Sequence, residues 1–338
     1  ARPDQMENFK NVDPRWVDVP FDPGRKYTVP WAMGIVGVVV NTDVYKGDIN
    51  TSAVIFDPPE ELKGKVNIVP AMNEIIDMAI GYVGGQPCTT DKAILKAARD
   101  KLMAAKPNWA GRDIDGKLLM KNGFDWLNAF DPEVQNFMIS LFKEVVTNYE
   151  IDGVQGDDRL PALPSTGGYD AYTVNMFKTE NGFDPPANFR DAFWLDWRAK
   201  KLNAFMKKLR NEVKAVKPNV MLTMSPSPFP WGRDEYLQDW PTWVDSGWVD
   251  AILPQCYRYD IAAYNATIAQ QKGYYKNPAV AFYPGVLLKV GNYVTSVSLL
   301  NKMIQTNRNN GFKGECYFFY EGIKDQINWF QLQYPYIK

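Results

Sequence analysis

The chain of 338 residues is long enough for one large barrel or for two ordinary domains. Its 38 basic and 39 acidic side chains nearly cancel, which excludes a long-range attraction to nucleic acid or to an anionic membrane and favours a small neutral ligand. It has no His, so Ser-His-Asp and Cys-His nucleophile systems and all His-ligated metal sites are excluded, and acid–base chemistry must use carboxylates, Tyr or Lys.

The first part of the chain, residues 1–107, predicts a small α/β segment. Its candidate strands are residues 27–30, 35–41 and 65–69. Two helices are predicted to follow. The first covers about residues 73–83 and ends at Gly84 and Gly85, and the second covers residues 90–106, with Thr90-Asp91 as its N-cap.

The second part, residues 108–338, consists of repeated helix-then-strand units, a pattern typical of a parallel sheet covered by helices. The helices are predicted over residues 132–149, 193–216, 239–244, 261–272 and 297–309. The strands are predicted over residues 153–156, 220–224, 251–255, 280–283 and 316–320. The connection over residues 160–189 is long enough to be a lid or a binding loop.

The cysteines and the apolar runs place further limits on the chain. Cys88, Cys256 and Cys316 are odd in number and form no CxxC motif, so we expect buried free thiols rather than a disulfide framework. No stretch approaches the roughly 18 apolar residues that a membrane-spanning helix needs, so we expect no membrane span.

Polar side chains follow the predicted strands of the second part, where a (β/α) barrel carries its working residues. These candidate site residues are Gln155, Asp157, Asp158, Arg159, Gln255, Tyr257, Arg258, Tyr283, Tyr320 and Glu321. Acidic residues on two different strands suit glycoside hydrolysis, with one carboxyl near the anomeric carbon and one near the leaving oxygen. Trp231, in a Pro-rich loop, is a candidate for contact with a sugar ring.

Two interpretations of the acidic residues remain open. The adjacent charges of Asp157 and Asp158 should raise one pKa unless an Arg neutralises them, which would provide one acid and one base. Alternatively, one Asp caps the next segment and Arg159 pairs with it. Glu321 has either a catalytic role or a structural ion pair with an Arg. No DxDxDG loop is present, so we expect neither a metal nor a cofactor.

Several short sequence segments of the second part are similar to those of a known family. They are Asp115 to Lys117, Trp126 to Val134, Asp152 to Arg159, Leu237 to Pro241, Pro254 to Arg258 and Phe318 to Glu321. Because of these segments, residues 109–338 resemble a glycoside-hydrolase-like family of bacterial (β/α)8 proteins found among exported lipoproteins. The resemblance implies an extracytoplasmic, retaining-type hydrolase with Asp157 as the nucleophile and Asp158 or Glu321 as the general acid/base. Gln255, Tyr257 and Arg258 would then position the substrate.

The first part resembles a different family. The sequence segments that carry this resemblance are Pro20 to Pro23, Tyr27 to Trp31, Gly37 to Asn41, Glu61 to Val66 and Thr89 to Asp91. Residues 4–107 thereby resemble an internal fragment of a polyamine-type extracytoplasmic solute-binding protein. Where that family often has a ligand-binding carboxylate, this chain has Ala71-Met72, and Glu74 remains as the obvious counter-charge for an ammonium ligand.

Together the two resemblances predict a chimera. The first three β/α units of the hydrolase-like family are missing, and the three candidate strands of residues 1–107 bring the five strands of residues 108–338 to eight. We therefore expect an α/β, TIM-barrel-like (β/α)8 fold in which the binding-protein fragment replaces those units. The expected function is that of a carbohydrate-active glycoside hydrolase-like barrel acting on a small-molecule or oligosaccharide ligand. The alternatives are a polyamine or sugar binding module without turnover, and an engineered or recombined chimera with no native function.

Overall fold

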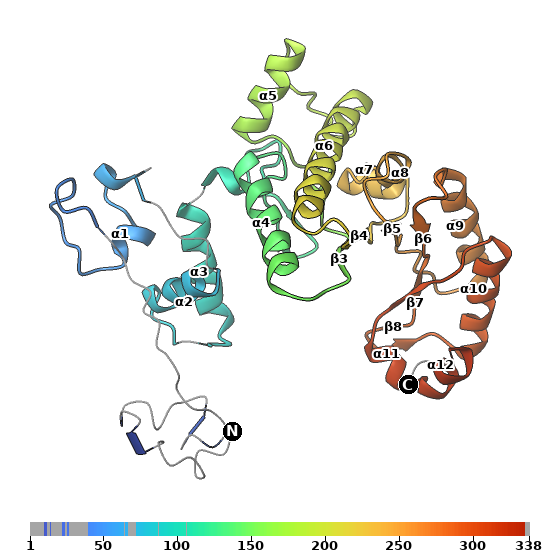
Figure 1. Ribbon diagram of the computed structural model, residues 1–338. Helices are drawn as coiled ribbons and strands as arrows, with labels where there is room; N and C mark the ends of the chain where they lie inside the picture. Colours follow the sequence, from blue (N-terminus) through green and yellow to red (C-terminus); the bar gives the residue numbers. More distant parts are fainter. Residues whose placement is uncertain are drawn as a thin grey trace. The chain divides into compact units, whose positions relative to one another are not determined.

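The computed structural model describes residues 10, 11, 14, 22, 23, 26, 40–63, 65–66, 72–86, 88–105 and 107–334. The chain divides into two compact units, Ala1–Ala105 and Lys106–Lys338, and Figure 1 traces their elements in chain order. The predicted strands of the first unit lie mostly outside the described residues. Their described ends, Val40, Asn41, Lys65 and Val66, are not in strands.

The described core of the first unit is helical. It contains α1 (Ala53–Phe56), a short 3-10 helix (Glu60–Leu62), α2 (Met72–Tyr82) and α3 (Lys92–Ala105), which confirms both predicted helices. Val54, Phe56, Ala79, Ile80 and Ala98 are buried together in one hydrophobic cluster. On the surface, the Asp57 carboxylate accepts hydrogen bonds from the Lys101 ammonium and the Tyr82 hydroxyl, both at 2.6 Å, and so joins all three α-helices.

A parallel sheet forms the centre of the second unit. Its four strands lie in the order β3 (Gly153–Gly156), β4 (Met221–Met224), β5 (Ala251–Ile252) and β6 (Ala281–Phe282). Directly after β6, β7 (Gly285–Leu287) pairs in parallel with β10 (Cys316–Phe318). The predicted alternation of helices and parallel strands is therefore confirmed.

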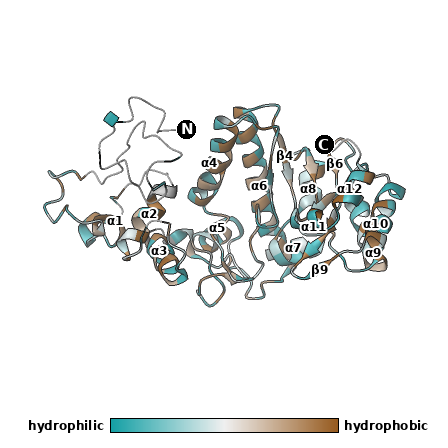
Figure 2. Ribbon diagram, turned by 90° about the horizontal axis from the view of Figure 1, so that it is seen from below, coloured by the Kyte–Doolittle hydropathy of each residue, from teal (hydrophilic) through white to brown (hydrophobic). Residues whose placement is uncertain are grey.

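Helices connect these strands. They are α4 (Pro132–Asn148), α5 (Ala171–Asn181), α6 (Ala192–Val216), α7 (Trp231–Tyr236), α8 (Trp240–Asp245), α9 (Ile261–Tyr274) and α10 (Val297–Asn309), followed after β10 by α11 (Glu321–Lys324) and α12 (Ile327–Gln333). Figure 2 shows hydrophobic and hydrophilic residues interleaved along α4 and α6. This is the pattern of helices that bury one side and expose the other.

The two faces of the sheet differ in their side chains. Residues at the same level of paired parallel strands point to the same face. One such level contains Gly156, Met224, Ile252 and Phe282, and its side chains join the main hydrophobic core with residues of the helices. The level before it contains Gln155, Thr223, Ala251 and Ala281 and faces the opposite side. These smaller or polar side chains line the face that would be the interior of a closed barrel.

β3 lies at one edge of the described sheet. The carbonyls of Asp152 and Gly156 accept hydrogen bonds from the backbone of β4 and the residue after it. Because alternate residues of a parallel strand serve opposite neighbours, Gly153 and Gln155 direct their peptide groups away from β4. No strand among the described residues pairs with that edge. The described strands therefore form part of a barrel rather than a closed one.

Some local expectations are wrong. The strand predicted over residues 280–283 is present as β6, which ends at Phe282, but the separate strand β7, which pairs with β10, was not predicted. The predicted long loop contains the helix α5, and the hairpins β1 (Met120–Lys121) with β2 (Phe124–Asp125) and β8 (Lys289–Val290) with β9 (Tyr293–Val294) were not predicted. All three cysteines are free, but Cys88 is exposed rather than buried.

Two features are absent from the described residues. None of their helices combines the length and the apolar character that crossing a membrane requires. In the same part of the chain, no group of three or more Cys, Asp or Glu side chains is arranged to hold a metal ion.

Candidate active site at the ends of the parallel strands

The acidic pair follows β3 in a tight turn. Gly156 ends the strand, and a Cβ there would lie 2.3 Å from the Met224 sulfur and 3.0 Å from the Leu160 carbonyl oxygen, so only glycine fits. One Asp157 carboxylate oxygen accepts the backbone N–H of Arg159 at 2.8 Å, while 64% of the side chain stays exposed. The predicted capping role therefore applies to Asp157, and its second carboxylate oxygen lies 3.7 Å from the Arg159 guanidinium.

Asp158 is the more enclosed member of the pair. Its side chain is 33% exposed, and its backbone carbonyl accepts a hydrogen bond from the buried Gln238 amide at 3.2 Å. Burial raises the pKa of Asp158 above its ordinary value; the Arg159 guanidinium opposes the rise and the Asp157 charge adds to it. Asp158 therefore retains its proton to a higher pH than an ordinary aspartate does.

Arg159 links the acidic pair to the β1–β2 hairpin. Its guanidinium lies 3.3 Å from an Asp158 oxygen and 3.7 Å from an Asp157 oxygen, and it stacks 4.4 Å from the centre of the Phe124 ring. Such a cation–π contact fixes the planar guanidinium in one orientation. This position is compatible with both roles predicted for Arg159, which are ion pairing with the two aspartates and contact with a substrate.

The hairpin is in turn attached to α7. Lys121 pairs with Glu235 at 2.7 Å, and the Asn122 amide donates to the Tyr236 hydroxyl at 2.7 Å. Trp231, at the start of α7, packs edge-on against Tyr236 with 5.6 Å between the ring centres. Because 53% of Trp231 remains exposed, its other side is open for contact with a ligand.

Gln255 and Tyr257 follow β5 and contact the chain segments on either side of it. The Gln255 amide donates to the Ser225 carbonyl at 3.1 Å, which joins the segments that follow β4 and β5. Tyr257 rests on Gly285 of β7, where a Cβ would lie 3.0 Å from its ring, and its ring centre is 5.0 Å from that of Phe318. Burial raises the pKa of Tyr257, and the charge of Asp158 adds to the rise, so the hydroxyl stays protonated.

The remaining predicted residues are less closely associated with this centre. Arg258 donates to the carbonyl of its neighbour Tyr257 at 2.6 Å. Tyr283 lies between β6 and β7 against Gly314, at the start of the β7–β10 ladder rather than at its end. Gln155 is exposed on the inner face of β3.

The residues after β10 are turned to solvent. Tyr320 is exposed, and Glu321 begins α11 and pairs with Lys324 at 3.2 Å within the same helix. The structural alternative for Glu321 therefore involves a lysine instead of the expected arginine. No described contact joins Glu321 to the segment that contains Asp157 and Asp158.

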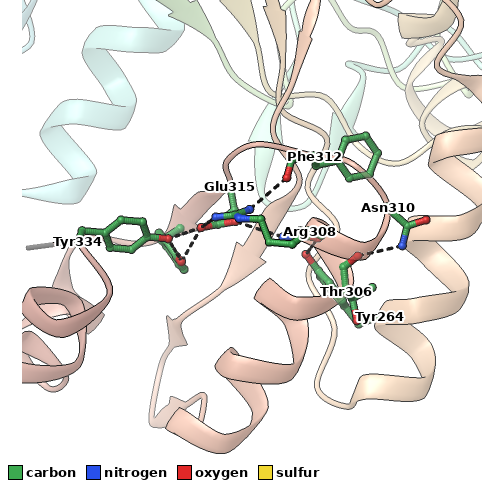
Figure 3. A network of polar contacts seen from close by, with 9 residues as sticks. Tyr264, Thr306, Arg308, Asn310, Phe312, Glu315 and Tyr334 are labelled. Carbon is green, nitrogen blue, oxygen red and sulfur yellow. Dashed lines mark hydrogen bonds and ion pairs between the residues drawn. The ribbon is translucent and has the colours of Figure 1, made fainter.

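Sequence reasoning missed a deeply buried carboxylate of the second unit, Glu315, whose side chain is 1% exposed. Arg308 donates to it at 2.8 Å and Tyr317 at 3.0 Å, and Tyr334 also donates to it (Figure 3). Burial alone would raise the pKa of Glu315, but the hydrogen bonds from Arg308 and Tyr334 hold it below its ordinary value. Glu315 precedes β10, at the end opposite the candidate site, so it serves to anchor the strand. The signal available in the sequence was a lone Glu directly before an apolar strand.

Comparison with known proteins gives two kinds of similarity. The family model of glycosyl hydrolase-like 10 matches residues 92–298. The glycosyl hydrolase DigH of Escherichia coli K12 is 31% identical over 157 residues, which cover 39% of this chain and 33% of that protein. The spermidine/putrescine-binding periplasmic protein 1 of Haemophilus influenzae is 37% identical over 101 residues, covering 30% of this chain and 28% of that protein. The mixed resemblance predicted from the sequence is confirmed, and the chain spans a third or less of the length of both relatives.

The fold also has a counterpart among solved structures. The glycoside hydrolase domain of PgaB from Bordetella bronchiseptica superimposes with a TM-score of 0.51 at 14% identity, covering 65% of this chain and 67% of that domain. At an identity this low, the similarity is evidence for the fold alone. The superposition confirms the predicted α/β, TIM-barrel-like architecture.

Proposed function

The chain belongs to the glycosyl hydrolase-like 10 family, and from this premise we propose that it hydrolyses glycosidic bonds with Asp158 as its general acid. The observation that supports this role is the half-buried position of Asp158, where burial raises the carboxyl pKa. A general acid must hold its proton at the working pH, and a raised carboxyl pKa meets that need. Asp157, exposed beside it, is the proposed nucleophile.

The chemistry of the proposed reaction balances with these two carboxyls. A carboxylate oxygen of Asp157 forms a bond to the anomeric carbon while the bond to the leaving oxygen breaks, and Asp158 transfers its proton to that oxygen. A water molecule then displaces Asp157, and its proton returns to Asp158. Gln255, Tyr257 and Arg258 are the proposed substrate-positioning residues, and Glu321 remains the alternative acid.

The test of this function is the hydrolysis of a panel of aryl glycosides across pH. We expect activity to fall as pH rises through the pKa of Asp158, because the acid then loses its proton. The Arg159 guanidinium lowers that pKa, so Arg159→Gln should raise it and move the alkaline limb of kcat/KM to higher pH. As a control, Lys143→Gln removes a cation that pairs with Glu212 between α4 and α6. An unchanged or downward-shifted limb in Arg159→Gln would contradict the assignment of Asp158.

We propose further that residues 1–107 take the place of the first three β/α units and that residues 108–338 supply the last five. The edge of β3 with which no described strand pairs supports this proposal, since Gln155 directs its peptide groups away from β4. We expect the Gln155 amide to exchange with solvent deuterium about as slowly as that of Val154, which faces β4. Residue-resolved hydrogen exchange on the full chain measures both. Fast exchange at Gln155 alone would show an unpaired edge and two separate, incomplete domains.

A second candidate function is the binding of a polyamine without turnover. The 37% identity with a spermidine/putrescine-binding periplasmic protein over 101 residues favours this function. The periplasmic location of that relative also supports an extracytoplasmic location for this chain. Titration with spermidine should then raise the melting temperature, and Glu74→Gln should abolish the effect. If neither polyamines nor glycosides have an effect, the remaining alternative is a chimera without a native function.

A further inference from the structure

One fully buried amide joins the turn after β3 to the loop after β4. Gln238 lies between α7 and α8 and is 0% exposed. Its Oε1 accepts the backbone N–H of Ser227 at 3.2 Å. Its Nε2 donates to the carbonyl oxygens of Asp158 at 3.2 Å and of Pro161 at 3.5 Å. Both ends of the carboxamide therefore bind backbone groups, and these groups belong to two different segments.

The partners of Gln238 fix the orientation of its amide. A backbone N–H can only donate and a carbonyl oxygen can only accept, so the flipped amide would lose its hydrogen bonds at both ends. The backbone of Gln238 is also held, since its N–H donates to the Gly232 carbonyl at 3.1 Å. Gly232 in turn lies against Ser227, because a Cβ at Gly232 would be 2.8 Å from the Ser227 carbonyl oxygen. The amide therefore reaches both segments from one fixed position.

The loop after β4 is a rigid support for this amide. It has the sequence Ser-Pro-Ser-Pro-Phe-Pro over residues 225–230. Because proline has a fixed φ and no N–H, the loop has little backbone freedom and only three N–H donors. Each donor binds a different part of the chain: Ser225 donates to Gly156 of β3, Ser227 to Gln238 and Phe229 to Gln271 of α9. The Gln238 amide is therefore anchored to a loop that cannot easily move.

Asp158 is held by an ion pair and by the hydrogen bond from this amide. The Arg159 guanidinium lies 3.3 Å from the Asp158 carboxyl, but the Arg159 side chain is 42% exposed. The bond from Gln238 acts on the Asp158 backbone instead. The carbonyl and the carboxyl branch from the same Cα, so fixing the peptide group leaves the carboxyl free only to rotate about its own side-chain bonds. We expect this bond to position the carboxyl more firmly than the exposed ion pair does.

We propose that Gln238 is a positioning residue for Asp158, because its amide holds the turn after β3 against the loop after β4 and so keeps the carboxyl half-buried. The inference rests on the proposed role of Asp158 as general acid and adds the residue that keeps this acid in place. Without the amide, the turn should move away from the loop and the carboxyl should become more exposed. Since burial is the largest cause of the raised pKa of Asp158, that pKa should then fall.

Gln238→Met tests the inference, because methionine fills a similar volume but binds neither segment. We expect kcat for aryl glycosides to fall by about tenfold to a hundredfold while KM stays within about threefold of wild type, since the acid is displaced and the substrate site is not. The alkaline limb of kcat/KM should also move to lower pH, because Asp158 then loses its proton earlier.

Gln271→Met is the matched control. Gln271 is also 0% exposed, and its amide binds the backbone N–H and carbonyl of Phe229 at 2.8 and 2.7 Å. None of its described hydrogen bonds reaches the turn after β3. Urea unfolding should show a similar loss of stability in both variants, but Gln271→Met should keep kcat within about threefold of wild type and leave the alkaline limb in place.

A carboxyl titration separates this inference from the proposed hydrolase function. The full chain with 13C-labelled aspartate carboxyls is titrated by NMR, and Asp158→Asn identifies the Asp158 signal. We expect the pKa of Asp158 to be lower in Gln238→Met than in wild type and unchanged in Gln271→Met. If the pKa behaves in this way but the wild type hydrolyses no glycoside, the hydrolase function is wrong and the positioning of Asp158 by Gln238 stands.

An unchanged pKa of Asp158 in Gln238→Met, or an equal fall in both variants, overturns the inference, because the position of the carboxyl would then not depend on this amide. If Gln238→Met does not fold, Gln238→Asn takes its place in the same comparison. Asparagine keeps a neutral amide but is one methylene shorter, so it should fail to reach both segments at once and should lower the pKa of Asp158 in the same direction.

Discussion

Asp158→Asn is expected to lower kcat/KM for glycoside hydrolysis by about 10²- to 10⁴-fold, the usual contribution of a positioned general acid. The amide keeps the size of the carboxyl and the hydrogen bond from Gln238 to the Asp158 backbone, but it has no acidic proton to give. The loss should be smaller for aryl glycosides with very acidic phenol leaving groups, because these need little protonation. Initial rates across a series of leaving groups measure this dependence.

Two neighbouring substitutions make the interpretation specific. Asp152→Asn changes an exposed carboxyl at the opposite end of β3 and should leave kcat/KM within about threefold of wild type, an energy difference of less than 1 kcal/mol. Asp157→Asn should abolish activity for all leaving groups alike, as expected of a nucleophile. Hydrolysis that survives Asp157→Asn, or a loss in Asp158→Asn that is independent of the leaving group, would contradict the assigned roles.

Arg198→Met is expected to produce the largest loss of stability, at least about 3 kcal/mol. Arg198 is fully buried, and its guanidinium donates to the carbonyl oxygens of Ser165, Gly167 and Phe189. Burial lowers the pKa of this guanidinium to about 9. Methionine fills much of the volume but leaves these buried carbonyls without a donor, at about 1–3 kcal/mol for each.

The measurement is urea unfolding followed by tryptophan fluorescence. Lys207→Met, at an exposed position of the same helix α6, is the control and should shift stability by no more than about 0.5 kcal/mol. A similar shift for both variants would mean that the segment between Leu160 and Phe189 does not depend on Arg198 for its position.

Regular elements were predictable where local signals agree with packing. Helix α10 has the predicted bounds, because Ser296 caps its first turn and an apolar stripe of Leu300 and Met303 faces the core. β3 is likewise correct at Gly153–Gly156. Helix α5 was missed because its apolar residues, such as Phe177, pack against rings of α6 instead of following a strong amphipathic pattern. The strand β7 was missed because it forms by pairing with β10, which is distant in sequence.

The composition of the candidate site was predictable, but the division of roles within it was not. The position after β3 identifies Asp157 and Asp158, yet only the fold shows that one forms a turn with Arg159 and that the other is half-buried beside Gln238. The contact between Arg159 and Phe124 joins residues that are far apart in the sequence. Such differences come from tertiary packing, which spacing along the chain does not contain.

The unequal surroundings of the three cysteines make the chain suitable for selective labelling. Burial raises the pKa of Cys256 to about 12 and also raises that of Cys316, so at neutral pH both remain unreactive thiols. Cys88 is exposed in the first unit. A maleimide dye therefore attaches preferentially there, and energy transfer from that dye to an acceptor introduced in the second unit reports the separation of the two units directly, without removal of any native residue.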